Sequence, residues 1–516
     1  MMLRFGLLFG LTVIFFPIYY YLRRPFFKLP LHRDTGFYVS NQTICERRFN
    51  YKAGWNAHFA FCSKVIPELF YSLIYLKYGG ASYDFQSRRW LSFFNYMTAV
   101  AVALCAYVVA GNQWAVYIFA LAAYALLSSH PHAGVYFESA EQFEPFFQII
   151  AFAAVWTGIF QHEPWWLFAG ISIWFLNGFL IKTSSLAVAI LTALYACYIQ
   201  TALSVLIVTA VLLSLIFYVG WVYSQGKRLK DFWRPSVRHE HYWHHHISTH
   251  QIVTHLLNKC AILMRGAVTG APFIFLCACA GLLVKGFHMP LLVVYLTGCV
   301  IVYFIQVGRI WYYVILFLPP LALLSGLGMH WIIEKGGVLG WGLWAVGLGL
   351  DVTMLYLRSR GDTNVLNQRV WQPYGQWMAK QNRALQAYID SLDMKMTRGT
   401  LWVFGVCNQA YVMLERAYPS PYISGALWLD FMDPDWQLKL ARSFVQQPPD
   451  YILATDECFC PEQLKNQLHL TYKCISTFEA FKLYELEKGQ AHPICADQVE
   501  MYDTKRALQL REAECY

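Results

Sequence analysis

The sequence predicts a polytopic α-helical membrane protein with a small water-soluble α/β domain at its carboxyl end. Three observations predict this fold class. Of 516 residues, 57% are hydrophobic and only 14% are charged. Apolar runs of membrane-helix length recur along the first two thirds of the chain. Residues 358–516 hold 17 of the 40 Lys and Arg residues and 19 of the 31 Asp and Glu residues, so charge is concentrated in the last third.

Apolar windows predict about eleven membrane helices. The first run is followed by Arg23, Arg24 and Pro25 rather than by small residues typical of a cleavage site, so we expect a first span rather than a cleaved signal. An odd number of spans puts the tail on the opposite side from the amino terminus, which we expect to be cytoplasmic. The predicted spans lie near 5–22, 91–110, 114–128, 146–160, 165–181, 185–200, 203–223, 266–284, 289–307, 310–330 and 337–357.

Two connections within the predicted membrane domain, residues 1–357, are too long and polar to be simple turns. The first, residues 23–90, contains an apolar stretch interrupted by Lys64, Glu68 and Lys77, which is typical of an amphipathic helix lying in the membrane interface. The second, residues 224–265, is basic, aromatic and rich in histidine. We expect both to lie outside the cytoplasm.

The tail, residues 358–516, reads as an extracytoplasmic α/β domain. Buried strands are predicted at 400–406 and 450–456, closing strands within 472–486, and helices at 436–447 and 460–468. No glycine-rich phosphate fingerprint accompanies these strands. Six of the 14 cysteines lie in the tail, where an exported domain could pair some of them.

The carboxylates of the membrane domain are scarce and one-sided. With a cytoplasmic amino terminus, Asp34, Glu141 and Glu144 fall outside, close to the ends of helices, and so do Lys182 and Arg309. This crowding of cations outside conflicts with the positive-inside rule, which is weakest for long loops. One interpretation is that these groups only make loops soluble. The other is a site in which a base activates a hydroxyl and cations stabilise an anionic phosphate.

Several short motifs carry a family resemblance. They are "RDTGFYV" after the first span, "YGGASYDFQSRRW" at the end of the first loop, "FEPFF", "GFLIKTSSLAV" and "GRIWYYVILFLPPLALLSG". Together they resemble GT-C glycosyltransferases that use polyprenyl-phosphate sugars, in the branch of protein mannosyltransferases and lipid A aminoarabinose transferases. The resemblance implies a GT-C fold, a lipid-linked sugar donor and transfer with inversion outside the cytoplasm.

The resemblance also implies roles for individual residues. Asp34 matches the catalytic carboxylate that takes the proton from the acceptor hydroxyl. A second catalytic acid matches either Glu144 or Glu141, and both stay open. The first loop departs from the usual pattern, and Lys64 stands where a family lysine is expected. The positions that match donor phosphate binding are Lys182, Arg309, Tyr312, Tyr313 and Lys64.

The histidine-rich loop has two interpretations. As a loop folding over substrate, it would use side chains such as Arg238, His241, Trp243 and His245 for hydrogen bonds and sugar stacking. As a metal site, it offers imidazoles at i, i+4 spacing. On a helix, side chains with this spacing project from the same face and could bind one ion. The candidate ligands are His241, His245, His246, His250 and Glu240. No cofactor is otherwise predicted, and a divalent metal is the only one considered.

These observations predict an inverting membrane glycosyltransferase in a plasma (inner) membrane. The expected partners are a polyprenyl-phosphate sugar donor, a lipid, glycan or protein acceptor and membrane lipids, with no nucleic acid. The alternative function is a multi-span transporter or flippase of an anionic lipid or sugar. A transporter predicts ionisable residues within several spans and related halves, and the sequence has few of the former and none of the latter.

Overall fold

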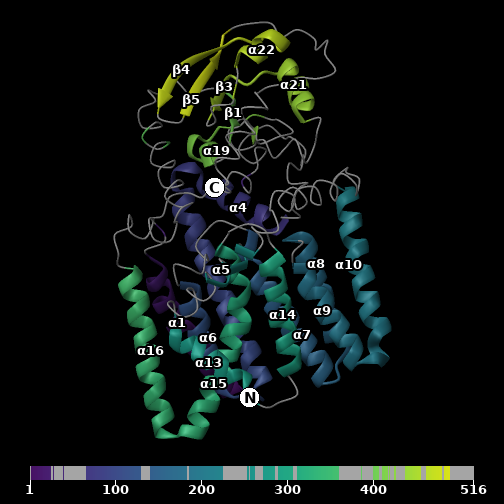
Figure 1. Ribbon diagram of the computed structural model, residues 1–516, viewed down its shortest axis with the longest axis vertical. Helices are drawn as coiled ribbons and strands as arrows, with labels where there is room; N and C mark the ends of the chain where they lie inside the picture. The colour runs from purple at the N-terminus through teal and green to yellow at the C-terminus, as the bar shows by residue number, and fades with distance from the viewer. Residues whose placement is uncertain are drawn as a thin grey trace.

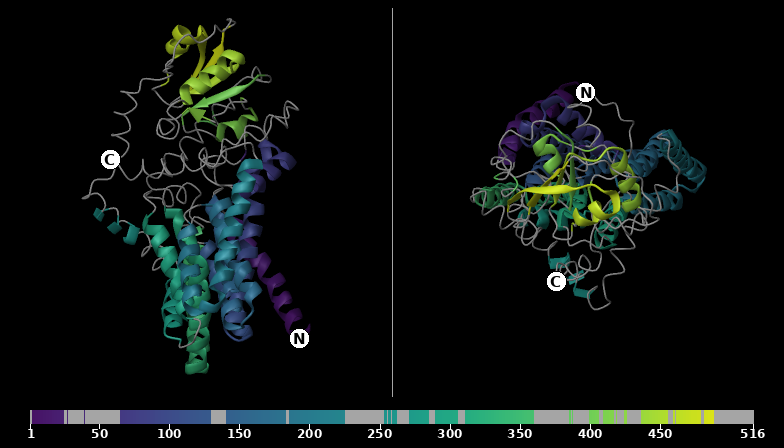
Figure 2. Two further views of the ribbon diagram at one scale, coloured as in Figure 1. Left: turned by 90° about the vertical axis from the view of Figure 1, so that its right-hand side faces the viewer. Right: turned by 90° about the horizontal axis from the view of Figure 1, so that it is seen from above.

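A computed structural model gives the structure of the protein as a helical bundle with an α/β domain at one end (Figure 1). The amino terminus of the first helix lies at the opposite end, and the same arrangement is seen from the side (Figure 2). We call the end that carries the α/β domain the domain end. The structure describes residues 2–24, 27, 39, 65–129, 140–182, 185–224, 253–254, 256–257, 259–261, 271–284, 289–305, 311–359, 385, 387, 399–405, 409–416, 418, 424–425, 436–454, 459, 461–478 and 481–487.

Eleven apolar helices form the bundle within the described residues. Four are long and apolar enough to cross a membrane, and seven shorter apolar helices accompany them. The prediction of about eleven membrane helices is confirmed. They are α1 (Met2–Arg23), α5 (Gly80–Val109), α6 (Trp114–Ser129), α7 (Glu144–Phe160), α8 (Pro164–Leu180), α9 (Ser185–Ile199), α10 (Ser204–Ser224), α13 (Pro272–Leu282), α14 (Met289–Ile305), α15 (Leu318–Gly336) and α16 (Val338–Ser359).

Helix α5 begins well before the apolar window that predicted it. Its N-cap is Gly79, whose φ of 76° is a conformation that favours glycine. The turns that follow hold Asp84, Arg88 and Arg89, which end an apolar window but do not interrupt a helix. The first loop, predicted to extend to residue 90, is therefore helical from Gly80 onward. Polar helical turns protruding from a bilayer are invisible to hydropathy.

Close approach of backbones holds the bundle together. A Cβ at Gly328 of α15 would overlap the carbonyl oxygen of Cys277 in α13, and a Cβ at Gly281 of α13 would overlap the carbonyl oxygen of Leu324. Small residues at helix interfaces allow such contact where lipid supplies no hydrophobic driving force. The carboxylate of Asp351 on α16 accepts hydrogen bonds from the backbone N–H groups of Phe273 (3.2 Å) and Ile274 (3.0 Å) and caps α13.

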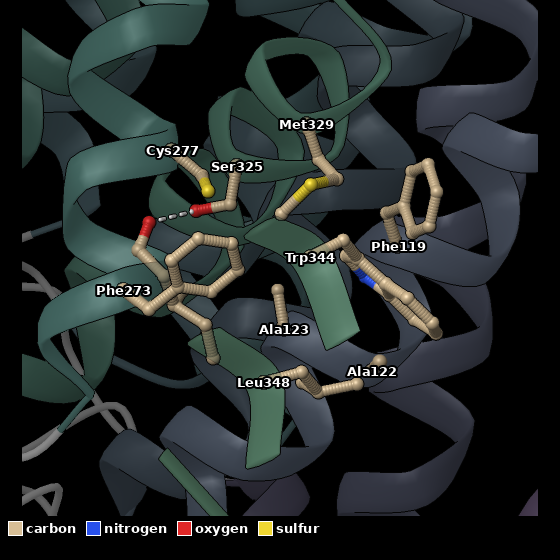
Figure 3. A pocket seen from close by; sticks show the side chains of 10 residues that line it. Phe119, Ala122, Ala123, Phe273, Cys277, Ser325, Met329, Trp344 and Leu348 are labelled. Carbon is tan, nitrogen blue, oxygen red and sulfur yellow. Dashed lines mark hydrogen bonds between the residues drawn. The ribbon is translucent and has the colours of Figure 1, made fainter. Parts of the chain in front are cut away.

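A small pocket lies among α6, α13, α15 and α16 (Figure 3). Its walls are mainly apolar and include Phe119, Met329 and Trp344. The hydroxyl of Ser325 donates to the carbonyl oxygen of Ile274 at 2.8 Å, so its proton is already used within the protein. This pocket offers no cation for a phosphate, and the candidate site lies elsewhere.

The α/β domain contains a five-stranded sheet in the order β2-β1-β3-β5-β4. Strand β1 runs parallel to β2 and β3, whereas β3, β5 and β4 are mutually antiparallel neighbours. All strands and helices predicted in the tail are present; α19 and β2 are additional. The elements are β1 (Leu401–Phe404), α19 (Gln409–Leu414), β2 (Ser424–Gly425), α21 (Trp436–Gln446), β3 (Tyr451–Ala454), α22 (Pro461–Leu468), β4 (Tyr472–Phe478) and β5 (Phe481–Leu486).

Strand β1 is buried on both faces, and each face belongs to a different core. Trp402 and Phe404 pack with Trp436 and Phe444 of α21. Leu401 and Val403, which point the other way because side chains alternate along a strand, belong to a cluster that extends into the membrane domain. Of the tail cysteines, Cys474 alone lies within the described residues, and it is a free, exposed thiol.

Helix α4 (Val65–Tyr78) lies between the bundle and the α/β domain (Figure 1). Tyr71 and Tyr75 are fully buried, while Leu69 and Leu73 on the other face are 47% and 56% exposed. A helix that buries one face in protein and exposes leucines at the edge of a bundle fits an interfacial position. This is the amphipathic helix predicted in the first loop.

The α13–α15 contact gives a test of the fold. Gly328→Ala places a Cβ against backbone that cannot move aside, so we expect a loss of ~3 kcal/mol in unfolding free energy. Gly342→Ala on α16 is the matched control, since no heavy atom lies within 4 Å of a Cβ there. Thermal unfolding of purified protein in detergent measures both; equal midpoints would contradict the packing described.

Candidate functional site

Buried polar side chains gather at the domain end of the bundle. They come from three places far apart in the sequence: the short 3₁₀ helix η4 (Ala140–Gln142) with the first residues of α7, the α8–α9 connection, and the first half of α5. The residues that are less than 9% exposed include Arg88, Ser92, Asn95, Glu141, Gln142, Glu144, Gln148 and Ser185. Burying so many polar groups is costly unless they bond to one another, and several do.

Glu141 and Lys182 form an ion pair between the Nζ and Oε1 atoms. The side chain of Glu141 is 4% exposed and that of Lys182 is 16% exposed, so the ammonium group keeps some access to the outside. Lys182 directly follows α8, where the backbone N–H groups of Ile181 and Lys182 donate to the carbonyl oxygen of Asn177. A cation at a helix carboxyl end is favoured by the helix dipole.

Glu144 is the first residue of α7 and is completely buried. Its Oε2 atom accepts a hydrogen bond from the hydroxyl of Ser185, the first residue of α9. A carboxylate in the first turn of a helix is stabilised by the dipole of that helix and by the bond from Ser185. The α8–α9 connection thus supplies one partner to each of the two glutamates.

Phe143, between these glutamates, fixes where they point. Its ring lies 5.1 Å from Phe70 of α4, 5.8 Å from Tyr71 of α4 and 4.9 Å from Phe94 of α5. The same hydrophobic cluster includes Leu401 and residues of β3 and β5 in the α/β domain. The α/β domain and α4 therefore brace the residue that separates Glu141 from Glu144.

A second 3₁₀ helix, η6 (Trp311–Phe317), contacts η4, α7 and α14. It contains Tyr312 and Tyr313, which follow Arg309 in the sequence. The helix η6, which begins within the late "GRIWYY" motif, and the segment with the "FEPFF" motif, more than 150 residues apart, therefore come together at the domain end. At Tyr312 and Tyr313 the structure describes the backbone only.

Arg23 links α1 to α5 and α6 in the same region. Its Nη1 atom donates to the carbonyl oxygen of Ser128 in α6 at 2.6 Å, and its Nε atom donates to the hydroxyl of Ser92 in α5 at 3.4 Å. Arg23 is the last residue of α1, so these bonds fix the point where the chain leaves the bundle towards the segment with Asp34. On α5, Asn95 donates to the Oε1 atom of Gln142 at 3.4 Å.

Comparison with known proteins identifies the fold. No protein-family model and no curated protein matches the sequence. The crystal structure of ArnT from Cupriavidus metallidurans bound to undecaprenyl phosphate superimposes with a TM-score of 0.56 at 12% identity, over 94% of this chain and 99% of that chain. The structure of the same ArnT in the apo state gives 0.55 at 12% identity, over 92% and 97%. The chain has the GT-C fold.

Within this GT-C fold, three predicted site residues are described with their side chains, and they come together. Glu141 and Lys182 are paired, and Glu144 lies at the start of the next helix. The remaining predicted side chains lie outside the described residues, and their roles stay predictions. These are Asp34, Lys64, Arg238, Glu240, His241, Trp243, His245, His246, His250, Arg309, Tyr312 and Tyr313.

The predicted metal site is a separate question from the ion pair. Within the described part of the chain, no three His, Cys, Asp or Glu side chains cluster as metal ligands would. The candidate metal ligands all belong to the histidine-rich loop, outside the described residues. What the described residues can do is hold an anion near Lys182 and keep carboxylates within the same region.

The sequence did not predict the uncharged side chains that hydrogen-bond around the two glutamates in this GT-C fold. Ser185, Gln148 and Asn95 are buried polar residues in or beside apolar helices, and Gln148 lies one helical turn from Glu144. Polar side chains within membrane helices are the signal that could have pointed to them.

Lys259, which precedes α13 in the sequence and contacts Tyr303 near the end of α14, is another buried group that was missed. Its Nζ atom donates to the carbonyl oxygen of Tyr303 at 2.6 Å, and burial lowers the pKa of Lys259 to about 8. This bond, together with the hydrogen bond that the Tyr303 hydroxyl donates to the carbonyl oxygen of Lys259, ties Lys259 to α14.

The ion pair gives a test of the site. Glu141→Gln or Lys182→Met alone removes one member of this largely buried ion pair and takes from the other the partner described here, so each should cost on the order of 3 kcal/mol of stability. The double variant Glu141→Gln/Lys182→Met removes both charges and should recover most of that loss. Thermal unfolding of the four proteins forms a double-mutant cycle, and additive losses would show that the two groups do not interact.

Proposed function

We propose that this protein is an inverting glycosyltransferase that moves a sugar from a polyprenyl-phosphate carrier to a hydroxyl acceptor at the extracytoplasmic face of the membrane. The observation that carries the proposal is the Lys182–Glu141 pair beside buried Glu144, at the end of a GT-C bundle and next to η6. The similarity to an ArnT that binds undecaprenyl phosphate supports a carrier of this class. The sugar and the acceptor stay open.

The chemistry needs an anion site and a base. The departing carrier phosphate gains negative charge, and Lys182, with access to the outside, is the described cation suited to stabilise it. When the carrier binds, the Lys182 ammonium would exchange the Glu141 carboxylate for the carrier phosphate, so it would be paired with an anion before and after binding. Arg309, Tyr312 and Tyr313 are proposed to complete the phosphate site, and Lys64 to contribute from the first loop.

The proton of the acceptor hydroxyl is proposed to go to Asp34. The segment that holds Asp34 leaves α1 at Arg23, which is anchored to α5 and α6. Glu144, and Glu141 once released from Lys182, are proposed to orient the acceptor or the sugar hydroxyls. The histidine-rich loop, with Arg238, His241, Trp243 and His245, is proposed to cover the substrates.

The decisive experiment uses purified protein in nanodiscs. A panel of radiolabelled undecaprenyl-phosphate sugars is offered together with a membrane lipid extract, and release of sugar from the carrier is measured. We expect release with at least one sugar. Asp34→Asn should lower the rate at least ~100-fold, because general-base catalysis is worth 10²–10⁴-fold. Glu163→Gln, an exposed acid at the opposite end of the bundle, is the control and should be unchanged.

Release that survives Asp34→Asn would refute the assignment of the base. No release with any sugar, together with movement of a fluorescent polyprenyl-phosphate sugar between the leaflets of vesicles, would favour the transporter instead.

Lys182 gives a separate prediction about the donor. In the stability-matched double variant Glu141→Gln/Lys182→Met, loss of the cation should weaken binding of undecaprenyl phosphate ~10- to 100-fold, the range expected for a charged hydrogen bond. Glu141→Gln alone should bind at least as tightly as the native protein, since the competing carboxylate is gone. Binding is measured by microscale thermophoresis in detergent. Equal affinity of the double variant and the native protein would remove Lys182 from the phosphate site.

A further inference from the structure

A chain of hydrogen bonds runs from Glu144 into the membrane interior. The hydroxyl of Ser185 donates to Glu144, the side-chain amide of Gln148 donates to Ser185 at 3.3 Å, and the phenol of Tyr295 donates to the Oε1 atom of Gln148 at 3.1 Å. The four side chains come from α7, α9 and α14, and each is 0% exposed. Tyr295 lies in the middle of α14, well away from the end of the bundle that holds the proposed site.

The chemistry of each group gives the chain one direction. A carboxylate can only accept, so the proton of Ser185 points to Glu144. The oxygen of Ser185 then accepts from the NH₂ group of Gln148, which turns the amide carbonyl of Gln148 towards Tyr295. The phenol of Tyr295 must therefore donate. Every proton points towards Glu144, and such aligned bonds polarise and strengthen one another in a low-dielectric interior.

Tyr295 is held rigidly at the far end of this chain. Its ring stacks on Phe152 of α7, with centroids 5.4 Å apart and planes at 27°, and meets the edge of Trp174 of α8 at 5.5 Å and 79°. Three helices thus fix the position of one phenol oxygen. Because the chain from that oxygen contains no water-exposed link, it transmits this fixed position to the carboxylate.

We propose that Tyr295 is a positioning residue for Glu144. Through Gln148 and Ser185 it holds the Glu144 carboxylate in one orientation with a fixed hydrogen-bond donor. The carboxylate is then already correctly oriented when the acceptor or the sugar binds. The chemical use of Glu144 rests on the proposed function, whereas the control of its orientation by Tyr295 does not. A purely packing role for Tyr295 would leave the carboxylate unaffected by loss of one hydroxyl.

Infrared spectroscopy tests this control without any substrate. The carboxylate stretching band of Glu144 is identified as the one missing from Glu144→Gln. Tyr295→Phe keeps the ring and removes the hydroxyl, and it should shift that band because the donor at the end of the chain is lost. Ser185→Ala, which removes the direct donor, should shift the band further. Tyr96→Phe, which removes a hydroxyl of α5 that donates to the carbonyl oxygen of Thr12 in α1, is the matched control and should leave it unchanged.

Turnover then tests the link to function. With an active donor, Tyr295→Phe should lower kcat about fivefold, the effect of one hydrogen bond, with little change in the KM for donor. On the Ser185→Ala background the same substitution should have almost no further effect, because the chain is already broken. Tyr96→Phe should keep native kcat.

The outcomes separate the two proposals. An unmoved band in Tyr295→Phe, or independent and multiplicative losses in the two variants, would overturn the positioning role. A shifted band with unchanged kcat in an active enzyme would confirm that Tyr295 orients Glu144 and would overturn the chemical use of that orientation. No transfer by the native protein would count against the proposed function alone, and the band would still decide whether Tyr295 orients Glu144.

Discussion

A charge next to a bilayer core needs a counter-charge, and the domain end of this protein is organised by that constraint. Lys182 and Glu141 neutralise each other where two helices meet. The pairing ties the α8–α9 connection to η4, and Ser185 on the same connection then reaches Glu144 on α7. The ion pair offsets part of the cost of burying the charged and polar groups around it.

Hydrophobic contacts carry this arrangement into the α/β domain. Phe143 packs on α4 and α5, and the cluster it belongs to continues to Leu401, Val403 and Leu453 in the sheet. The two faces of β1 therefore serve different purposes: one builds the core of the domain, and the other attaches the domain to the bundle. The α/β domain is a part of the framework around the proposed site rather than a separate attachment.

Hydropathy predicted the helices well because burial in lipid demands long apolar runs, which the sequence displays directly. It missed the first turns of α5 because Arg88 and its polar neighbours lie above the apolar region. Family motifs pointed to Glu141, Glu144 and Lys182, and the structure brings these together. Ser185, Gln148 and Tyr295 could not be predicted, since their importance lies only in contacts among three helices that no local pattern encodes.

The backbone N–H group of Gly80 donates to the carboxylate of Glu415, a residue 335 positions further along the chain. The opening turn of α5 therefore lacks this acceptor until the chain has been synthesised as far as residue 415. The α/β domain thus supplies the cap for a helix whose own sequence comes more than 300 residues earlier.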